Sequence, residues 1–77
     1  MARAQYFVVL HNDEWKIKHG EKHYGPYPSQ TAAIKAAVDT ANKAGLDGQD
    51  SQVLVQDLNH QFRTEWTYGN DPYPPKG

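Results

Sequence analysis

Hydrophobic and polar residues follow a strand-like pattern in two short stretches near the start of the chain. Residues 5–10 are aromatic and β-branched, and the run is too short for a helix, so a strand is predicted there. In residues 14–18 two apolar side chains alternate with Lys16 and Lys18, which is typical of a strand with one buried and one solvent-facing side. Because only the polar turn residues 11–13 separate the stretches, the pattern predicts an antiparallel hairpin.

A helix is predicted after an irregular stretch. Residues 19–28 contain two glycines and two prolines, which interrupt any regular element. Ser29 follows and is suited to cap a helix, because its hydroxyl can accept a hydrogen bond from a free backbone N–H. Gly45 is predicted to take the left-handed conformation that ends a helix. Between them, small and apolar residues recur at helical spacing: Ala33, Ile34, Ala37, Val38, Ala41 and Ala44.

The second half of the chain predicts another hairpin and a proline-rich tail. Residues 52–56 and 62–68 have strand-like patterns, and a loop of ordinary hairpin length joins them. Alternation places one set of fourth-strand residues on a common face: Phe62, Thr64, Trp66 and Tyr68. The tail, residues 70–77, is rich in proline and is expected to be extended chain outside the sheet.

The order β-β-α-β-β predicts a small α+β domain of two layers, with an antiparallel sheet and one helix packed on one face. A single domain is expected over residues 1–69, followed by the tail at 70–77. A sheet covered on one face leaves its other face open to a partner.

The chain resembles a bacterial family, the "domain of unknown function 2188" proteins. The resemblance rests on the first hairpin, on the alanine-rich helix and above all on the unusual ending at residues 67–77. It implies two hairpins separated by a helix, and it carries no established activity. The chain departs from the family in the turn at 57–60, where a glycine is expected, and at Trp66, where a polar residue is expected.

Composition and charge exclude several classes of protein. The 77 residues contain 8 Lys and Arg against 9 Asp and Glu, a net charge of −1, which excludes a histone-like polycation. The chain has no Cys, which excludes disulfides, thiol nucleophiles and iron–sulfur sites. No apolar run approaches the roughly 18 residues of a membrane span. We therefore expect a cytoplasmic protein that does not contact a membrane.

No pattern points to catalysis, a cofactor or a metal. His19 and His23 are spaced four apart, but the nearby Gly and Pro residues argue against the helix that would bring them together. Ser29 is explained as a helix cap, and the carboxylates Asp47 and Asp50 lie in a polar loop without a pocket. The sequence therefore favours a protein that is not an enzyme.

The favoured hypothesis is a small non-catalytic interaction module of unknown biological role. It would bind protein, including a second copy of itself, through the open sheet face and the aromatic second hairpin. The candidate contact residues are Phe62, Trp66, Tyr68 and Tyr73. The alternative for these rings is internal: Tyr73 and the prolines of the tail would fold back over them.

The second hypothesis is weak, sequence-tolerant binding of nucleic acid. Basic side chains in and after the first hairpin lie close in sequence to Trp15, Tyr24 and Tyr27, and cations beside exposed rings suit single strands. The candidate contacts are Lys16, Lys18, Lys22 and Arg63. The competing interpretation is that lysines keep the solvent side of a strand soluble.

Overall fold

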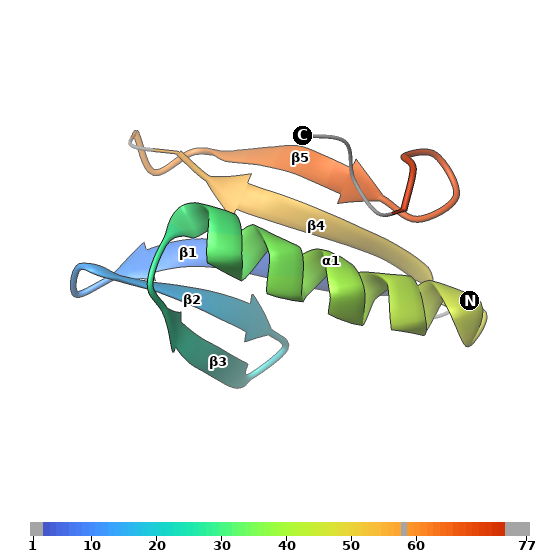
Figure 1. Ribbon diagram of the computed structural model, residues 1–77, viewed down its shortest axis with the longest axis horizontal. Helices are drawn as coiled ribbons and strands as arrows, with labels where there is room; N and C mark the ends of the chain where they lie inside the picture. Colours follow the sequence, from blue (N-terminus) through green and yellow to red (C-terminus); the bar gives the residue numbers. More distant parts are fainter. Residues whose placement is uncertain (1–2, 58, 74–77) are drawn as a thin grey trace.

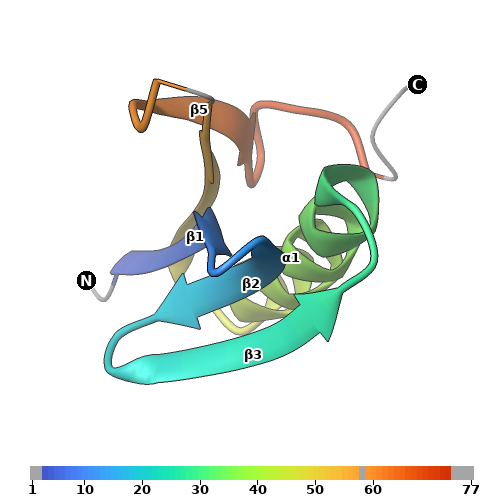
Figure 2. The same ribbon diagram turned by 90° about the vertical axis from the view of Figure 1, so that its left-hand side faces the viewer.

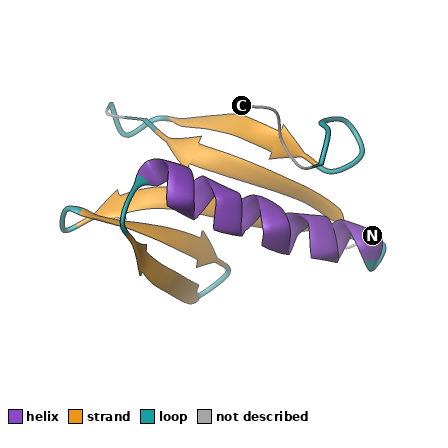
Figure 3. Ribbon diagram, viewed as in Figure 1, coloured by secondary structure: helices purple, strands orange, loops and turns teal. Residues whose placement is uncertain are grey.

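One helix lies along one face of a five-stranded sheet in the computed structural model, which describes residues 3–57 and 59–73 (Figures 1 and 3). The strand order across the sheet is β3-β2-β1-β4-β5. The predicted α+β class, with two layers and the helix on one face, is confirmed. Within the described residues, no helix has the length and apolar character needed to cross a membrane. The elements are β1 (Arg3–His11), β2 (Glu14–His19), β3 (Lys22–Tyr27), α1 (Gln30–Leu46), β4 (Asp50–Gln56) and β5 (Phe62–Thr67).

Both predicted hairpins are present, and each turn contains residues with positive φ. Asn12 and Asp13 have φ values of 51° and 63°, the backbone shape of the tight two-residue turn that matches the twist of two antiparallel strands. In the β4–β5 loop, the Asp57 carboxylate accepts hydrogen bonds from the backbone N–H groups of Asn59 (2.8 Å) and Gln61 (2.9 Å). His60 has φ 62°, a conformation that the glycine expected in this turn would adopt easily.

Strand β3 lies in residues that the sequence pattern predicts to be irregular, because a glycine and a proline usually interrupt a regular element. It lies at the edge of the sheet and pairs only with β2. A proline is tolerated there, because one side of an edge strand has no neighbour to which its backbone must donate. Its register with β2 shifts between Trp15 and Ile17, next to Gly25 and Pro26 in the partner strand. An edge position and a bulge thus accommodate residues that would disrupt a central strand.

The predicted sheet was antiparallel throughout, and this is wrong at the central pair. β1 and β4 are parallel, with Tyr6 beside Val53 and Val8 beside Val55. The cause is β3, because this additional strand reverses the chain once more before α1 carries it back across the sheet. β4 therefore starts at the same end of the sheet as β1. The sheet is mixed, with antiparallel hairpins on both sides of a parallel centre.

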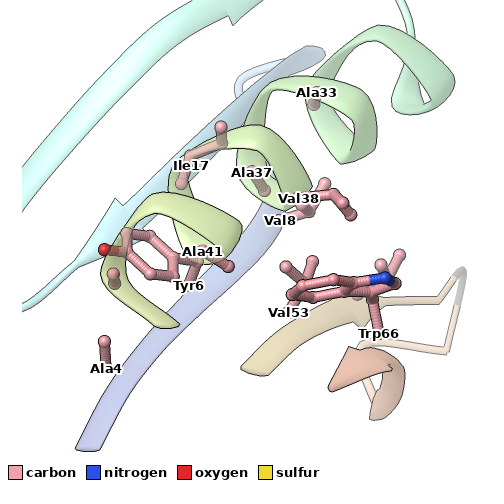
Figure 4. Close-up of a cluster of buried hydrophobic side chains, with 12 residues drawn as sticks. Ala4, Tyr6, Val8, Ile17, Ala33, Ala37, Val38, Ala41, Val53 and Trp66 are labelled. Carbon is pink, nitrogen blue, oxygen red and sulfur yellow. The ribbon is translucent and has the colours of Figure 1, made fainter. Parts of the chain in front are cut away.

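The core lies between the alanine face of α1 and the inner side chains of the strands (Figure 4). The helix begins as predicted, since the Ser29 hydroxyl accepts a hydrogen bond from the Ala32 N–H (3.1 Å). The Ser51 hydroxyl of β4, which is buried, donates to the Ala41 carbonyl of α1 (2.6 Å). The helix contributes mostly small side chains to the core: Ala33, Ala37, Val38, Ala41 and Ala44. The strands contribute larger ones: Tyr6, Val8, Ile17, Val53, Val55 and Trp66.

Gly45 lies inside the helix and does not end it, contrary to the prediction. The helix continues to Leu46, and the left-handed glycine is Gly48, with φ 93°. The Tyr68 ring lies directly on the helix backbone at Gly45, where an added Cβ would overlap the ring. The glycine is therefore explained by this close packing.

Gly45→Ala should change the stability of the fold in opposite directions, depending on Tyr68. In the unaltered background, overpacking against the Tyr68 ring should cost about 1–3 kcal/mol and outweigh the gain in helix propensity. In a Tyr68→Ala background the same substitution should stabilise by up to about 1 kcal/mol, because alanine is the better helix former. Urea unfolding of the four proteins measures both effects. Equal effects in the two backgrounds would mean that Tyr68 does not pack on Gly45.

Candidate binding surface on the open sheet face

The face of the sheet opposite α1 carries a row of partly exposed apolar side chains. In β1, Phe7 and Val9 alternate with residues that point into the core, and Phe7 lies beside Leu54 of β4. The Phe7 and Phe62 rings meet edge to face, with their centroids 5.4 Å apart. No other described segment lies over this face (Figure 2). We call Phe7, Val9, Leu54 and Phe62 the apolar stripe.

A bulge in β5 decides which aromatic residues belong to the stripe. Val53 lies beside Trp66 but Leu54 lies beside Thr64, so Glu65 is an extra residue in the ladder. The bulge reverses the alternation of side chains between the two halves of the strand. Phe62 lies on the open face and is 45% exposed, whereas Trp66 points into the core and is 2% exposed. The predicted common face of Phe62, Thr64, Trp66 and Tyr68 is therefore wrong.

Charged residues of both signs surround the stripe, and two polar amides lie at one end of it. Lys18 and Lys16 of β2 lie beside Phe7 and Val9, and the Lys16 ammonium is 4.0 Å from a Glu14 carboxylate oxygen. At the far end of β1, Arg3 lies beside Asp50 of β4. The Gln5 and Gln52 side chains are hydrogen-bonded (3.4 Å). A shallow hollow of about 600 Å³ on this face is lined by Arg3, Gln5, Phe7, Val9, Lys18, His19, Gly20 and Phe62.

One family model matches most of the chain. The model of a family described as "Uncharacterized protein conserved in bacteria (DUF2188)" matches residues 6–68. The chain belongs to this family. The match runs from β1 to Tyr68, the residue that packs on Gly45, and so covers the helix and most of the sheet. Neither the curated proteins nor the solved structures gave a significant match.

In this DUF2188 protein, most of the predicted protein-contact residues have contacts within the chain. Trp66 is buried in the core, and the Tyr68 ring lies on Gly45. Tyr73 meets the Trp66 ring edge to face, with centroids 6.3 Å apart, and its hydroxyl donates to Asp39 of α1 (2.7 Å). Of the four candidates, only Phe62 lies on the open face. The tail thus folds back over the aromatic residues as far as Tyr73, and residues 74–77 lie outside the described residues.

The predicted nucleic-acid contacts do not form one patch. Lys16 and Lys18 share the open face, but Lys22 lies beside His19, on the side of β2 that faces the helix. Arg63 lies in β5 beside Val55 and forms an ion pair with Glu65 (2.6 Å). Two strands separate it from β2.

The rings that accompany the lysines also differ from the prediction. Trp15 and Tyr27 pack against the core, on the opposite side from Lys16 and Lys18. The ring beside Lys18 is that of Phe7, which is not among the predicted contact residues. The alternation within residues 6–10 was the available signal, because it places Phe7 and Val9 on one side and Tyr6 and Val8 on the other.

His19 makes two contacts within the fold. His19 stacks on the Tyr6 ring, with centroids 4.3 Å apart, and its Nδ1 atom lies 3.1 Å from the Gln5 carbonyl oxygen. Across residues 3–57 and 59–73, no three His, Asp or Glu side chains lie together as a potential metal site.

Alkaline titration should reveal the contact between Tyr73 and Asp39. The hydrogen bond to Asp39, partial desolvation and the charge of that carboxylate together raise the pKa of Tyr73 above 10.0. Because the pKa is raised in the folded state, the contact stabilises the fold at pH values below 10 and is lost as the pH rises through the raised pKa. Tyrosinate absorbance should show a late-titrating tyrosine that Tyr73→Phe removes and Asp39→Ala shifts back towards 10.

Tyr6 provides the internal control for this titration. Burial, followed by the nearby Tyr24, raises its pKa independently of the tail. Its late titration should therefore persist in both variants. A titration curve that Asp39→Ala leaves unchanged would contradict the assignment to Tyr73.

Proposed function

We propose that the protein is a non-catalytic interaction module that binds protein through its open sheet face, and that the partner is a second copy of the chain. The observation that carries this proposal is the apolar stripe, in which Phe62 is 45% exposed although the chain has an extensive core elsewhere. Contiguous apolar side chains on the surface of a small protein indicate a contact site.

The arrangement of charge supports a protein partner. The stripe itself carries no charge, and the charged side chains lie around it, which is the composition of a protein interface with an apolar centre and a polar rim. The rim carries both signs: Lys16, Lys18 and Arg3 against Glu14 and Asp50. A surface with both signs can complement a second copy of itself, because a cation of one copy can face an anion of the other.

The molecule is broad enough for an interface of ordinary size. A typical stable interface buries about 800 Å² of each partner. In the view of Figure 1, which looks down the shortest axis, the molecule measures 34 by 29 Å. A face-to-face dimer would cover Phe7 and Phe62, and it would leave α1 on the outside of the assembly.

Nucleic acid is the alternative partner for the same face. Lys16 and Lys18 lie beside the apolar stripe, and cations next to aromatic rings can hold a single strand. The acidic residues Glu14 and Asp50 on this face oppose it, because phosphates favour a surface of one sign. The net charge of −1 adds no general attraction for a polyanion.

We also propose that the protein is cytoplasmic and that it does not catalyse a reaction. A cytoplasmic location agrees with the absence of Cys, since proteins of oxidising compartments often carry disulfides. The proposed non-catalytic role is supported by Ser29. This residue could be considered as a nucleophile from the sequence, but its hydroxyl caps the helix.

Phe62→Lys should weaken self-association at little cost to the fold. In a two-fold interface, a lysine at position 62 would face either the same lysine of the second chain or an aromatic ring of that chain. The dimer dissociation constant should therefore rise about tenfold or more. Leu46→Lys is the matched control, because Leu46 is 70% exposed at the end of α1, away from the open face. Light scattering over a series of protein concentrations gives the dissociation constants, and thermal unfolding checks the fold.

Either of two results would overturn self-association through this face. One is an unaltered chain that stays monomeric at all concentrations, and the other is a dimer that Phe62→Lys and Leu46→Lys affect equally. A third result, tight binding of a single-stranded oligonucleotide that falls steeply with salt and is lost in a Lys16→Glu, Lys18→Glu chain, would assign the face to nucleic acid.

A further inference from the structure

The last described residues of the chain form a short segment that closes a gap in the fold. We call residues 70–73 the strap. It leaves β5 through Gly69, which has φ 84°, and turns towards α1 (Figure 2). The Asp71 carboxylate accepts a hydrogen bond from the Thr67 N–H (2.8 Å), and the Asn70 and Asp71 N–H groups donate to the Thr67 carbonyl. These bonds hold the first half of the strap.

The second half of the strap is bound by residues of two different elements. The Trp66 indole N–H of β5 donates to the Pro72 carbonyl (2.9 Å), and the Trp66 and Tyr73 rings meet edge to face. The Tyr73 hydroxyl donates to the Asp39 carboxylate of α1 (2.7 Å). Trp66 and Asp39 thus form a seat for an extended segment that presents a carbonyl oxygen and then a phenol.

The seat exists because α1 does not cover the whole sheet. The helix packs mainly on β4 and β1, and Trp66 lies at the margin of this contact, in edge strand β5. Without the strap, the nearly buried indole N–H would lose the partner it has in Pro72. An aromatic side chain with one polar atom to satisfy is a common anchor for peptide segments.

The outer end of the strap, at Tyr73, lies at the surface of the domain. Tyr73 remains 47% exposed, and its partner Asp39 is exposed as well. Segments with few buried contacts open far more readily than the core does. Opening would uncover Trp66 and free the Asp39 carboxylate.

We infer that the seat between α1 and β5 is a peptide-binding site, and that it takes the strap of a second copy of the chain when its own strap is released. The occupant is identified by the structure, because the segment that fills the seat in cis has the matching carbonyl and phenol. An exchanged strap makes the same contacts as the native one. The cis strap competes at an effective concentration of about 1 mM, so exchange requires a weakened cis strap or a high protein concentration.

A peptide titration tests the seat itself. The full chain with Tyr73→Ala and Asp71→Ala has a weakened cis strap, and Trp15→Phe leaves Trp66 as the fluorescent reporter. A blocked peptide of residues 69–73 should change the fluorescence saturably, with a Kd below about 1 mM. The chain that retains its own strap should bind the peptide much more weakly. No saturation in the strap-weakened chain would overturn the site.

A double-mutant comparison tests the chemistry of the seat. The peptide with Tyr73→Phe should bind about tenfold more weakly, because it lacks the hydrogen bond to the Asp39 carboxylate. In a chain that also carries Asp39→Ala, the two peptides should bind equally. A persisting tenfold difference would mean that Asp39 does not receive the phenol. If the Tyr73→Ala chain does not fold, the Tyr73→Phe chain provides the same comparison with a milder change.

Mixing two damaged chains tests exchange between copies. One chain carries Asp39→Ala and keeps its strap, the other carries Tyr73→Ala and keeps its seat, and both carry Phe62→Lys to weaken association through the open face. The mixture should form heterodimers at concentrations above the peptide Kd, whereas each chain alone should remain monomeric. A mixture that stays monomeric there would overturn exchange, and a dimer of either chain alone would point to a different contact.

Discussion

The close approach of α1 to the central strands is the contact on which the rest of the structure depends. Four alanines face the sheet, and the Ser51 hydroxyl reaches the Ala41 carbonyl of the helix. Because the helix side chains are short, the bulk of the core comes from the strands, in residues such as Tyr6 and Trp66. The same closeness continues to the end of the helix, where Gly45 admits the Tyr68 ring.

A single helix packed this closely cannot cover five strands, and both candidate binding sites follow from that limit. No described segment covers the face of the sheet opposite α1, which carries the apolar stripe (Figure 2). On the helix side, the edge strand β5 extends past the helix, and the strap completes the burial of Trp66. The two sites therefore lie on opposite faces of the sheet, and each can be altered without directly changing the other.

The bulge at Glu65 divides the aromatic residues of β5 between these two sites. Without it, Phe62 and Trp66 would share a face, and the protein would have one large aromatic surface. With it, Phe62 joins Phe7 on the open face, and Trp66 anchors the strap. One extra residue in the ladder thus gives the strand an aromatic anchor on each side of the sheet.

The sequence by itself determined the features that depend on neighbouring residues. It determined the first hairpin, the Ser29 cap, the alanine face of the helix and the two-layer α+β class, because turns, caps and periodicity act within a few residues. Tertiary structure alone decided four features. These are the parallel pairing of β1 with β4, the formation of edge strand β3, the position of Gly45 inside α1, and the placement of Phe62 and Trp66 on opposite faces of the sheet. Each of these depends on a contact with another element: β2 supports the proline of β3, the Tyr68 ring packs on Gly45, and pairing with β4 defines the bulge at Glu65. Local pattern does not contain those partners, since they meet only when the sheet and the helix pack together.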